Sequence, residues 1–383
     1  MGMIGERVVR TEDPALVTGH GTFIDNLVLH DALHVVYVRS TMAHARILSI
    51  DTDTARSLPG VVGVFTHADL VADGIGPVPI DMPFLPTDIH RPALADGVVR
   101  FVGELVAAVV ATSRALAVDA ANEVVVDYQP LDILNDPEQA ITSSTLLFPQ
   151  HGSNVVVDLP AGREVDFSMC DVVVSARLHN RRIAPSPLEA RVAASRWEEP
   201  DASGVRRLTH WQACQGAHPI RNQISAFYGI PAEQIRVITP DVGGGFGAKA
   251  FFYPEDLLVP WLAKRTDRPV RYTETRSESM NGLGHGRGQI QDLRIGGSRD
   301  GRILAYELSV IQESGAYPRF GAFLPFMTGA MLTGTYDIPN AAMRAKGVVT
   351  NTVPTVAYRG AGRPEAAAAI ERAVDLFARE IGM

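Results

Sequence analysis

Glycines crowd one short stretch of the chain, DVGGGFGAK, around a single aromatic residue. Gly243, Gly244, Gly245 and Gly247 flank Phe246. Glycine permits positive φ and removes side-chain bulk, so successive N–H groups in such a turn can hold an anion or let a polar cofactor come close. A tight connection between a strand and a helix, with no ligand, would use the same residues. The motif alone leaves both interpretations open.

A dinucleotide site is a third interpretation of this loop. Gly243, Gly245 and Ala248 fit the fingerprint spacing when its last position is alanine. The context argues against it, because Pro254 interrupts the early part of the following helix and no standard βαβ unit comes after the loop. A nucleotide-binding oxidoreductase therefore ranks last, and binding of NAD or FAD to the isolated chain would test it.

Two other strand–loop–helix junctions offer small residues together with one polar group. Gln215 precedes a helix in HWQACQGAHP, and Arg359 lies in VAYRGAGRPEA before a helix that starts near Pro364. Helix N-termini and free N–H groups favour anions. Three such junctions could therefore surround one large polar ligand, provided that the fold brings them together.

Each of these residues also has a plainer role. Gln215 could cap the next helix, and Phe246 could fill the core, as a phenylalanine most often does. Arg359 could pair with Glu365 at the surface. Taken one at a time, the plainer roles are favoured.

Composition excludes several classes of function. The chain has 383 residues with a formal charge of −8, enough for two or three domains, and 46% of its residues are hydrophobic. No basic run suggests nucleic-acid binding, and no apolar stretch is long enough to indicate a membrane span or a signal peptide. The cytoplasm is the default location. Cys170 and Cys214 alone cannot hold an iron–sulfur cluster.

Strands and helices alternate along the chain, which predicts a mixed α/β (α+β) fold. β-branched runs predict strands at residues 33–40, 45–52, 61–66, 104–112, 171–179 and 235–242. Helices are expected at residues 53–60, 218–229 and 253–266, and from a cap at Ser113. Residues 363–382 form the clearest helix, with an apolar stripe of Ala368, Ile370, Ala373, Val374, Phe377 and Ile381. Residues 77–92 carry five prolines and predict an irregular loop, and a boundary is expected within residues 129–140.

Several ordered stretches carry a family resemblance. They include TGHGTFIDNL, RSTMAHARI, PGVVGVFTHADL and FVGELVAAVVA, followed by APSPLEARVAASRW, CQGAHPIRNQI, DVGGGFGAK, RPVRYTETRSESM and AYRGAGRPEAAAAIERAVD. Together they resemble the molybdopterin-binding large subunit of the xanthine dehydrogenase and aldehyde oxidase family, the molybdenum hydroxylases. The resemblance implies an N-terminal segment at residues 1–15, an a/b hammerhead domain at 16–132 and the first molybdopterin-binding domain at 133–383.

The resemblance assigns cofactor-side roles to matching positions. The glutamine near the metal oxo group falls on Gln215, the loop beside the metal on Gly244, Gly245, Phe246 and Gly247, and the arginine beside the metal on Arg359. The implied cofactor is molybdopterin with molybdenum, with a cytosine dinucleotide form as one option. Its dithiolene holds the metal, so no side chain of the protein is expected to ligate it.

Three positions depart from the purine-oxidising members. Ala250 replaces a glutamate, Met327 an arginine, and Ala361 a phenylalanine. These changes remove groups that would grip a purine, so the implied substrate is an aldehyde or an aromatic N-heterocycle rather than xanthine. Gly360 and Ala361 also replace the Cys-Ser pair expected of carbon monoxide dehydrogenases.

The family's large subunit is about twice as long as this chain. The general-base glutamate is expected in the second half, which leaves the catalytic residue unknown here. Surface or capping roles are expected for Glu255, Glu274, Glu278 and Glu313. The favoured interpretation is an N-terminal half-subunit of a split oxidoreductase, inactive without partners.

The expected partners are a second molybdopterin-binding half-subunit, an iron–sulfur subunit with [2Fe-2S] clusters and an FAD subunit. A small molecule is the expected substrate. The alternative is a truncated, non-catalytic fragment or an assembly module of such an enzyme.

Overall fold

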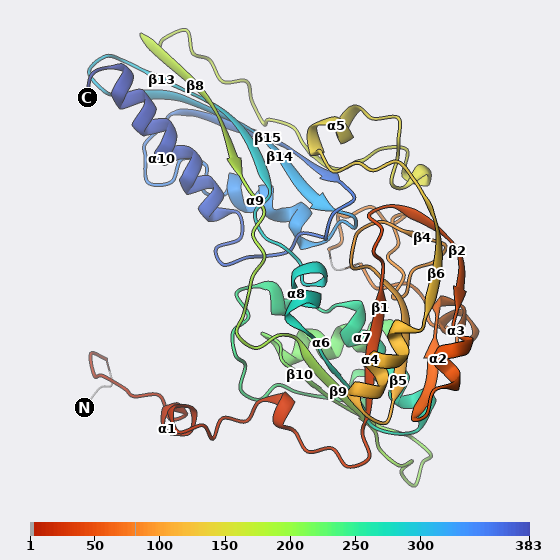
Figure 1. Cartoon of the computed structure of the whole chain (residues 1–383). Helices are drawn as coiled ribbons and strands as arrows, with labels where there is room; N and C mark the ends of the chain where they lie inside the picture. Colours follow the sequence, from red (N-terminus) through yellow and green to blue (C-terminus); the bar gives the residue numbers. More distant parts are fainter. Residues whose placement is uncertain (1–3, 81) are drawn as a thin grey trace.

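Three β-sheets organise the chain in the computed structural model, which describes residues 4–80 and 82–383 (Figure 1). The lower part of Figure 1 holds a seven-stranded sheet. Its strands, in spatial order, are β11 (Ile235–Ile238), β10 (Leu208–Gln212), β9 (Val192–Trp197), β12 (Val270–Thr273), β1 (Leu33–Arg39), β5 (Leu105–Ala111) and β3 (Val61–Phe65). The mixed α/β prediction is confirmed.

The seven-stranded sheet joins both halves of the sequence. β5 is an uninterrupted apolar run that is buried along its whole length, as expected for a strand covered on both faces. β1 pairs with β5 on one side and runs parallel to β12 on the other, with Leu33 opposite Val270. The sheet therefore crosses the boundary expected near residue 132, whose position stays a prediction. A small sheet of β4 (Val98–Val99), β2 (Ala45–Asp51) and β6 (Val125–Pro130) completes the N-terminal part.

A five-stranded sheet occupies the upper part of Figure 1. Its order is β7 (Val155–Leu159), β15 (Asn340–Val349), β14 (Ile303–Gly315), β13 (Gln289–Gly297) and β8 (Val172–Asn180). Helix α10 (Arg363–Glu380) packs against β8 and β13 and covers one face. Its buried side is formed by Ala366, Ala369, Ile370, Ala373 and Phe377.

One member of the predicted α10 stripe was wrong. Ala368 is exposed, whereas Ala366 and Ala369 are buried. With 3.6 residues per turn, positions three, four and seven after Ala366 share its side, and a position two residues later turns away. Ile370 and the later members of the stripe keep the predicted orientation.

The remaining helices have 5 to 13 residues, and local chemistry sets the ends of some of them. They are α1 (Asp13–Val17), α2 (Asp53–Ser57), α3 (His67–Ala72), α4 (Arg114–Asn122), α5 (Pro137–Thr142), α6 (Ala217–Tyr228), α7 (Pro254–Thr266), α8 (Arg276–Gly282) and α9 (Leu324–Gly329). The Ser113 hydroxyl accepts the Leu116 N–H, which confirms the predicted cap of α4. Gly229 ends α6 with left-handed backbone.

A few segments differ from expectation or lie outside the description. The strand predicted at residues 235–242 ends at Ile238, ahead of Pro240. The described residues of the predicted loop 77–92 contain no regular strand or helix, and its residue 81 lies outside the description, as do residues 1–3 of the predicted N-terminal segment. None of the helices in residues 4–80 and 82–383 combines the length and apolarity needed to span a membrane.

Candidate functional site

The three junctions singled out in the sequence meet in space. The Gly247 N–H donates to Gln215 Oε1 at 2.7 Å, and the Gln215 N–H donates to the Lys249 carbonyl at 2.9 Å. The Arg359 N–H donates to the Phe246 carbonyl at 2.8 Å. Hydrogen bonds therefore tie the loop after β10 and the loop before α10 to the glycine-rich loop after β11.

The amide of Gln215 has a defined orientation. A backbone N–H can only donate, so the bond from Gly247 requires the side-chain oxygen to face the loop. The Nε2 donor, on an exposed side chain, makes no hydrogen bond within residues 4–80 and 82–383. Gln215 does not cap α6, because the N-cap is Gly216 and makes no side-chain bond. Gln215 therefore offers a donor away from the loop.

The glycine-rich loop has unusual backbone geometry. Gly244, Phe246 and Gly247 have φ of 98°, 55° and 98°, and left-handed backbone is uncommon for a phenylalanine. The N–H groups of Gly244, Gly245 and Phe246 donate no hydrogen bond within the described chain. Phe246 is 39% exposed, so it does not fill the core. Three successive unpaired N–H groups in such a turn are typical of an anion-binding concavity.

Arg287, which the sequence reasoning missed, fixes the loop that carries Arg359. Its guanidinium donates to the carbonyls of Tyr358 at 3.1 Å and Arg359 at 2.9 Å, and it pairs with the buried Glu365 at 3.5 Å. Glu365 is thus paired with Arg287 instead of Arg359. The guanidinium of Arg359 is exposed and has no partner among the described residues. The sequence hint was an arginine between glycines, Gly286 and Gly288.

The structure brings two of the three substrate-pocket candidates together. A Cβ built on Gly362 would lie 2.7 Å from Met327 Cβ, so Met327 is beside the residue that follows Ala361. The Thr328 hydroxyl also donates to the Gly362 carbonyl at 3.0 Å. Ala250 ends a 3₁₀ turn at Ala248–Ala250. Its N–H donates to the Gly247 carbonyl at 3.1 Å, within the glycine-rich loop.

A series of phenylalanine rings connects Phe251, which follows Ala250, with Phe326, which precedes Met327. Neighbouring ring centroids lie 4.8 to 5.7 Å apart, and the rings belong to Phe251, Phe320, Phe323, Phe326 and Phe84. Phe84 and Phe326 are 42% and 39% exposed. Phe84 comes from the proline-rich loop, so this N-terminal loop reaches the region of α9. The sequence analysis missed the series because its members are far apart along the chain.

Charged side chains are buried beside the glycine-rich loop. Arg191 donates to Glu255 at 2.9 Å and to both oxygens of Glu274, and Arg39 pairs with Glu255 at 2.9 Å. The surface role expected for Glu255 and Glu274 was wrong, since they are 2% and 4% exposed. Two arginines can hold these carboxylates in the interior because each charge has a partner. Glu278 does cap α8, as expected.

Glu313, expected to have a surface or capping role, lies elsewhere. It pairs with Arg182 at 2.6 Å, and its side chain is 13% exposed. The surface expectation was therefore wrong here too. None of these four carboxylates forms a hydrogen bond with Gln215 in the described structure.

Asp256 is a buried carboxyl with a shifted proton affinity. Burial raises the pKa of its side chain to about 7, and the neighbouring Glu255 and Glu274 act in the same direction against Arg191. One oxygen accepts from Gln212 Nε2 at 3.0 Å, and the other has no partner in the described structure. Asp256 is therefore protonated over most of the acidic range.

We expect Asp256→Asn to flatten the pH dependence of stability. The pKa of Asp256 is higher in the folded protein than in the unfolded chain. Its protonation therefore stabilises the fold fully at a pH below the ordinary pKa, and this stabilisation is lost as the pH rises through about 7. Between pH 5 and pH 8, the wild type should lose roughly 2–3 kcal/mol of unfolding free energy that the variant does not lose. Urea unfolding of the purified chain at several pH values checks this. Asp292→Asn is the control, because Arg177 lowers the pKa of that carboxyl, and equal pH slopes in all three proteins would contradict the prediction.

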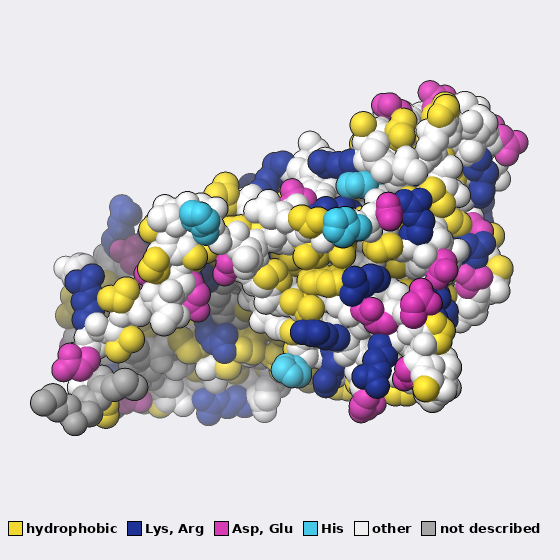
Figure 2. Space-filling view, turned by 90° about the horizontal axis from the view of Figure 1, so that it is seen from below, with side chains coloured by type: hydrophobic (Ala, Val, Ile, Leu, Met, Phe, Trp, Pro, Cys, Tyr) yellow, Lys and Arg dark blue, Asp and Glu magenta, His cyan; other side chains and the backbone are white. Residues whose placement is uncertain are grey.

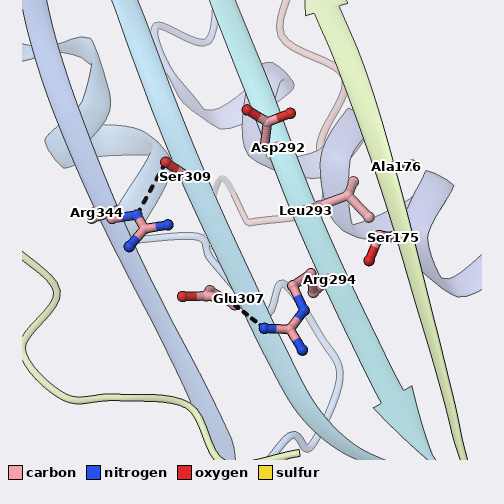
Figure 3. Close-up of a pocket in the computed structure, with 8 residues that line it drawn as sticks. All are labelled: Ser175, Ala176, Asp292, Leu293, Arg294, Glu307, Ser309 and Arg344. Atoms are coloured by element: carbon pink, nitrogen blue, oxygen red, sulfur yellow. Dashed lines mark hydrogen bonds and ion pairs between the residues drawn. The ribbon is translucent and has the colours of Figure 1, made fainter.

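A hollow of about 340 Å³ lies on the open face of the five-stranded sheet (Figure 3). Its charged side chains have partners, since Arg294 pairs with Glu307 at 3.5 Å, Arg344 donates to Ser309 at 3.2 Å, and Asp292 pairs with Arg177. It is lined by Ser175, Ala176, Asp292, Leu293, Arg294, Glu307, Ser309 and Arg344. No residue of the three converging loops lines it.

Figure 2 shows basic and acidic side chains interspersed over one face, with apolar ones gathered near its middle and no continuous basic patch. Within residues 4–80 and 82–383, no group of three or more His, Cys, Asp or Glu side chains could hold a metal ion. The converging loops are therefore the best candidate site.

Comparison with known proteins identifies the family. The model of the molybdopterin cofactor-binding domain matches residues 147–383, and that of the aldehyde oxidase and xanthine dehydrogenase a/b hammerhead domain matches residues 18–132. The chain belongs to the molybdopterin-binding large subunits of the xanthine dehydrogenase and aldehyde oxidase family. All three converging loops lie within the region matched by the molybdopterin model.

Individual members of the family cover almost the whole chain. It is 36% identical to the nicotine 6-hydroxylase large subunit of Paenarthrobacter nicotinovorans, over 99% of this chain and 47% of that protein. It resembles the crystal structure of quinoline 2-oxidoreductase from Pseudomonas putida 86 with a TM-score of 0.92 and 36% identity, over 99% of this chain and 48% of that one. The chain thus spans about half the length of these relatives.

A third relative has a comparable length. The nicotinate dehydrogenase large molybdopterin subunit of Eubacterium barkeri is 28% identical, over 100% of this chain and 87% of that subunit. The names of these relatives are those of hydroxylases, dehydrogenases and oxidoreductases, and several are named as subunits.

Proposed function

We propose that this chain provides the hammerhead and first molybdopterin-binding part of a molybdenum hydroxylase. The enzyme hydroxylates an aromatic N-heterocycle or an aldehyde with oxygen from water, and passes electrons to separate iron–sulfur and FAD subunits. A partner polypeptide supplies the second molybdopterin-binding part. The observation that carries the proposal is the convergence of the loops of Gln215, Phe246 and Arg359.

The groups at the converging loops suit an anionic cofactor. They are all donors, namely the unpaired N–H groups of Gly244, Gly245 and Phe246, the Nε2 group of Gln215, and the guanidinium of Arg359. Backbone donors and arginine are the groups that bind oxo and phosphate oxygens. Molybdopterin with molybdenum, in the plain or the cytosine dinucleotide form, fits this set. It supplies redox chemistry when bound, and no side chain of this chain ligates the metal.

Each residue has a limited role in this reaction. Gln215 donates a hydrogen bond without adding charge, and Arg359 offsets negative charge. The loop at Gly244, Gly245 and Gly247 lets the cofactor come close to the backbone. The general base is not among these residues, and the proposal assigns it to the second part of the family fold.

Apolar side chains support an aromatic substrate. Ala250, Met327 and Ala361 offer no charge to a bound molecule, and the rings of Phe84 and Phe326 are partly exposed nearby. Aromatic faces favour flat rings by offset stacking. Nicotine and quinoline, which the names of two relatives mention, are aromatic N-heterocycles. We therefore rank this class above aldehydes.

A separate partner polypeptide is supported by the nicotinate dehydrogenase subunit, which this chain matches over 87% of its length. The test is the native mass of the tagged chain purified from its own host, with molybdenum measured on the same sample. We expect a complex with a second molybdopterin-binding chain, iron–sulfur and FAD subunits, and about one molybdenum per chain. A chain of 41.3 kDa that stays alone and carries no molybdenum would indicate the non-catalytic fragment instead.

Gly247→Ala should release the cofactor from that complex. A Cβ at Gly247 would lie 2.8 Å from the Ala357 carbonyl oxygen, so the two loops must move apart. We expect at least a tenfold loss of molybdenum per chain, measured by elemental analysis. Gly204→Ala is the control, because Gly204 also has positive φ but nothing lies within 4 Å of its built Cβ. Equal loss in both variants would attribute the effect to backbone strain alone.

A further inference from the structure

We propose that Glu189 is a positioning residue that fixes the glycine-rich loop through hydrogen bonds at both of its ends, with Lys249 neutralising its charge. The inference rests on the proposed function, since it concerns the loop that would face the cofactor. Both side chains are turned away from solvent and toward each other. Their role would be to fix where Gln215 and Phe246 lie.

One oxygen of Glu189 bridges both ends of the loop. Oε2 accepts from the Gly243 N–H at 2.9 Å and from Lys249 Nζ at 2.9 Å. The Glu189 N–H also donates to the Gly243 carbonyl at 3.1 Å. A Cβ on Gly243 would lie 2.5 Å from Glu189 Cβ, so only glycine permits this close approach. The carboxylate thus spans the turn that contains the unpaired N–H groups.

Both charges of the pair are withdrawn from water. The side chains of Lys249 and Glu189 are 1% and 12% exposed. Burial lowers the pKa of the Lys249 ammonium, and its hydrogen bond and charge interaction with Glu189 oppose this change. Removing one partner of such a pair leaves a buried charge without compensation, whereas removing both is far less damaging.

The pair is linked directly to the donor side chain of the site. The Lys249 carbonyl accepts the Gln215 N–H, and Gln215 Oε1 accepts the Gly247 N–H. A shift of Lys249 would therefore move Gln215 with respect to Phe246. The backbone next to Glu189 is also fixed, because Arg276 donates to the carbonyl of the preceding residue, Leu188, at 3.1 Å.

Three variants separate positioning by Glu189 from simple charge balance. Lys249→Met leaves the carboxylate buried and unpaired. A double variant that combines Lys249→Met with Glu189→Gln removes that charge but keeps an oxygen that can accept the Gly243 N–H. Adding Glu189→Leu removes the charge and the acceptor with little change in volume. Both double variants lack the charge at residue 189, and only the Gln variant can accept the Gly243 N–H.

Two measurements on the purified full chain with its natural partners give the readout. Hydrogen exchange of the peptide spanning residues 243–249 reports the loop, and molybdenum per chain reports cofactor retention. We expect Lys249→Met to raise loop exchange and lower molybdenum at least tenfold. The Gln double variant should recover most of both, and the Leu double variant should not.

The pattern of outcomes decides the inference. Equal behaviour of the two double variants would overturn it, and so would a Lys249→Met chain that matches wild type. Glu307→Gln and Glu307→Leu, at the surface pair with Arg294, are controls that should change neither readout. If the wild-type chain carries no molybdenum, the proposed function fails, while loop exchange still tests Glu189.

Discussion

Arg191→Met will lower the free energy of unfolding by about 3–5 kcal/mol. The guanidinium is 3% exposed and is bonded to Glu255 and Glu274, which have almost no contact with water. It also lies over the ring of Tyr253 at 4.3 Å. Methionine has a similar length, so the variant leaves Glu255 paired with Arg39 alone and removes the guanidinium that pairs with the buried Glu274.

Urea unfolding of the purified chain measures this loss. Arg177→Met is the matched control, because Arg177 pairs with Asp292 and its side chain is 48% exposed. Exposed pairs contribute about 0–1 kcal/mol, so the control should stay near wild type. A second test adds Glu255→Gln and Glu274→Gln to Arg191→Met, which should restore part of the loss. If Arg191→Met and Arg177→Met lower the free energy of unfolding equally, burial of the ion pairs with Glu255 and Glu274 does not explain the contribution of Arg191.

Gly245→Ala should reduce turnover of the assembled enzyme by about a hundredfold, with the chain folded. Gly245 does not have positive φ, so alanine itself brings no backbone strain. Its Cβ would lie 2.5 Å from Gln215 Oε1 and 2.8 Å from Gln215 Cδ, which forces that side chain to leave Gly247. Losing one positioned donor at a reacting centre lowers kcat by about 10²–10³. This expectation rests on the proposed function.

Steady-state kinetics on a panel of aromatic N-heterocycles and aldehydes, with a dye as acceptor, provides the check. We expect a fall in kcat with little change in KM, because the pocket residues Ala250, Met327 and Ala361 are untouched. Gly162→Ala is the control, since nothing lies within 4 Å of its built Cβ and its φ is not positive. Unchanged kcat in Gly245→Ala, with molybdenum fully bound, would remove Gln215 from the proposed mechanism.

Local features of the fold were predictable because local residues decide them. The continuous apolar run of β5, the serine that caps α4 and the glycine that ends α6 were all correct. Ala368 was misplaced because an alanine-rich segment offers several stripes of similar apolarity. Only the other elements that pack on α10 select among them.

Contacts between distant residues were not predictable from residue types. Glu189 and Lys249 lie 60 positions apart, and nothing local to either distinguishes a buried partner from a solvated charge. Glu255 and Glu274 were assigned to the surface for the same reason. Convergence of the loops of Gln215 and Arg359 was a possibility that only the resemblance favoured, and their roles stay a prediction.

The pairing of β1 with β12 has a consequence for how the chain is made. β1 is complete early in synthesis, but the strand beside it ends at Thr273, far later in the chain. Pairings of such long sequence separation form slowly, and an unpaired strand edge is prone to join other chains. During synthesis, β1 therefore has no partner strand on one side until β12 has been made. Chaperone demand should be highest in this interval.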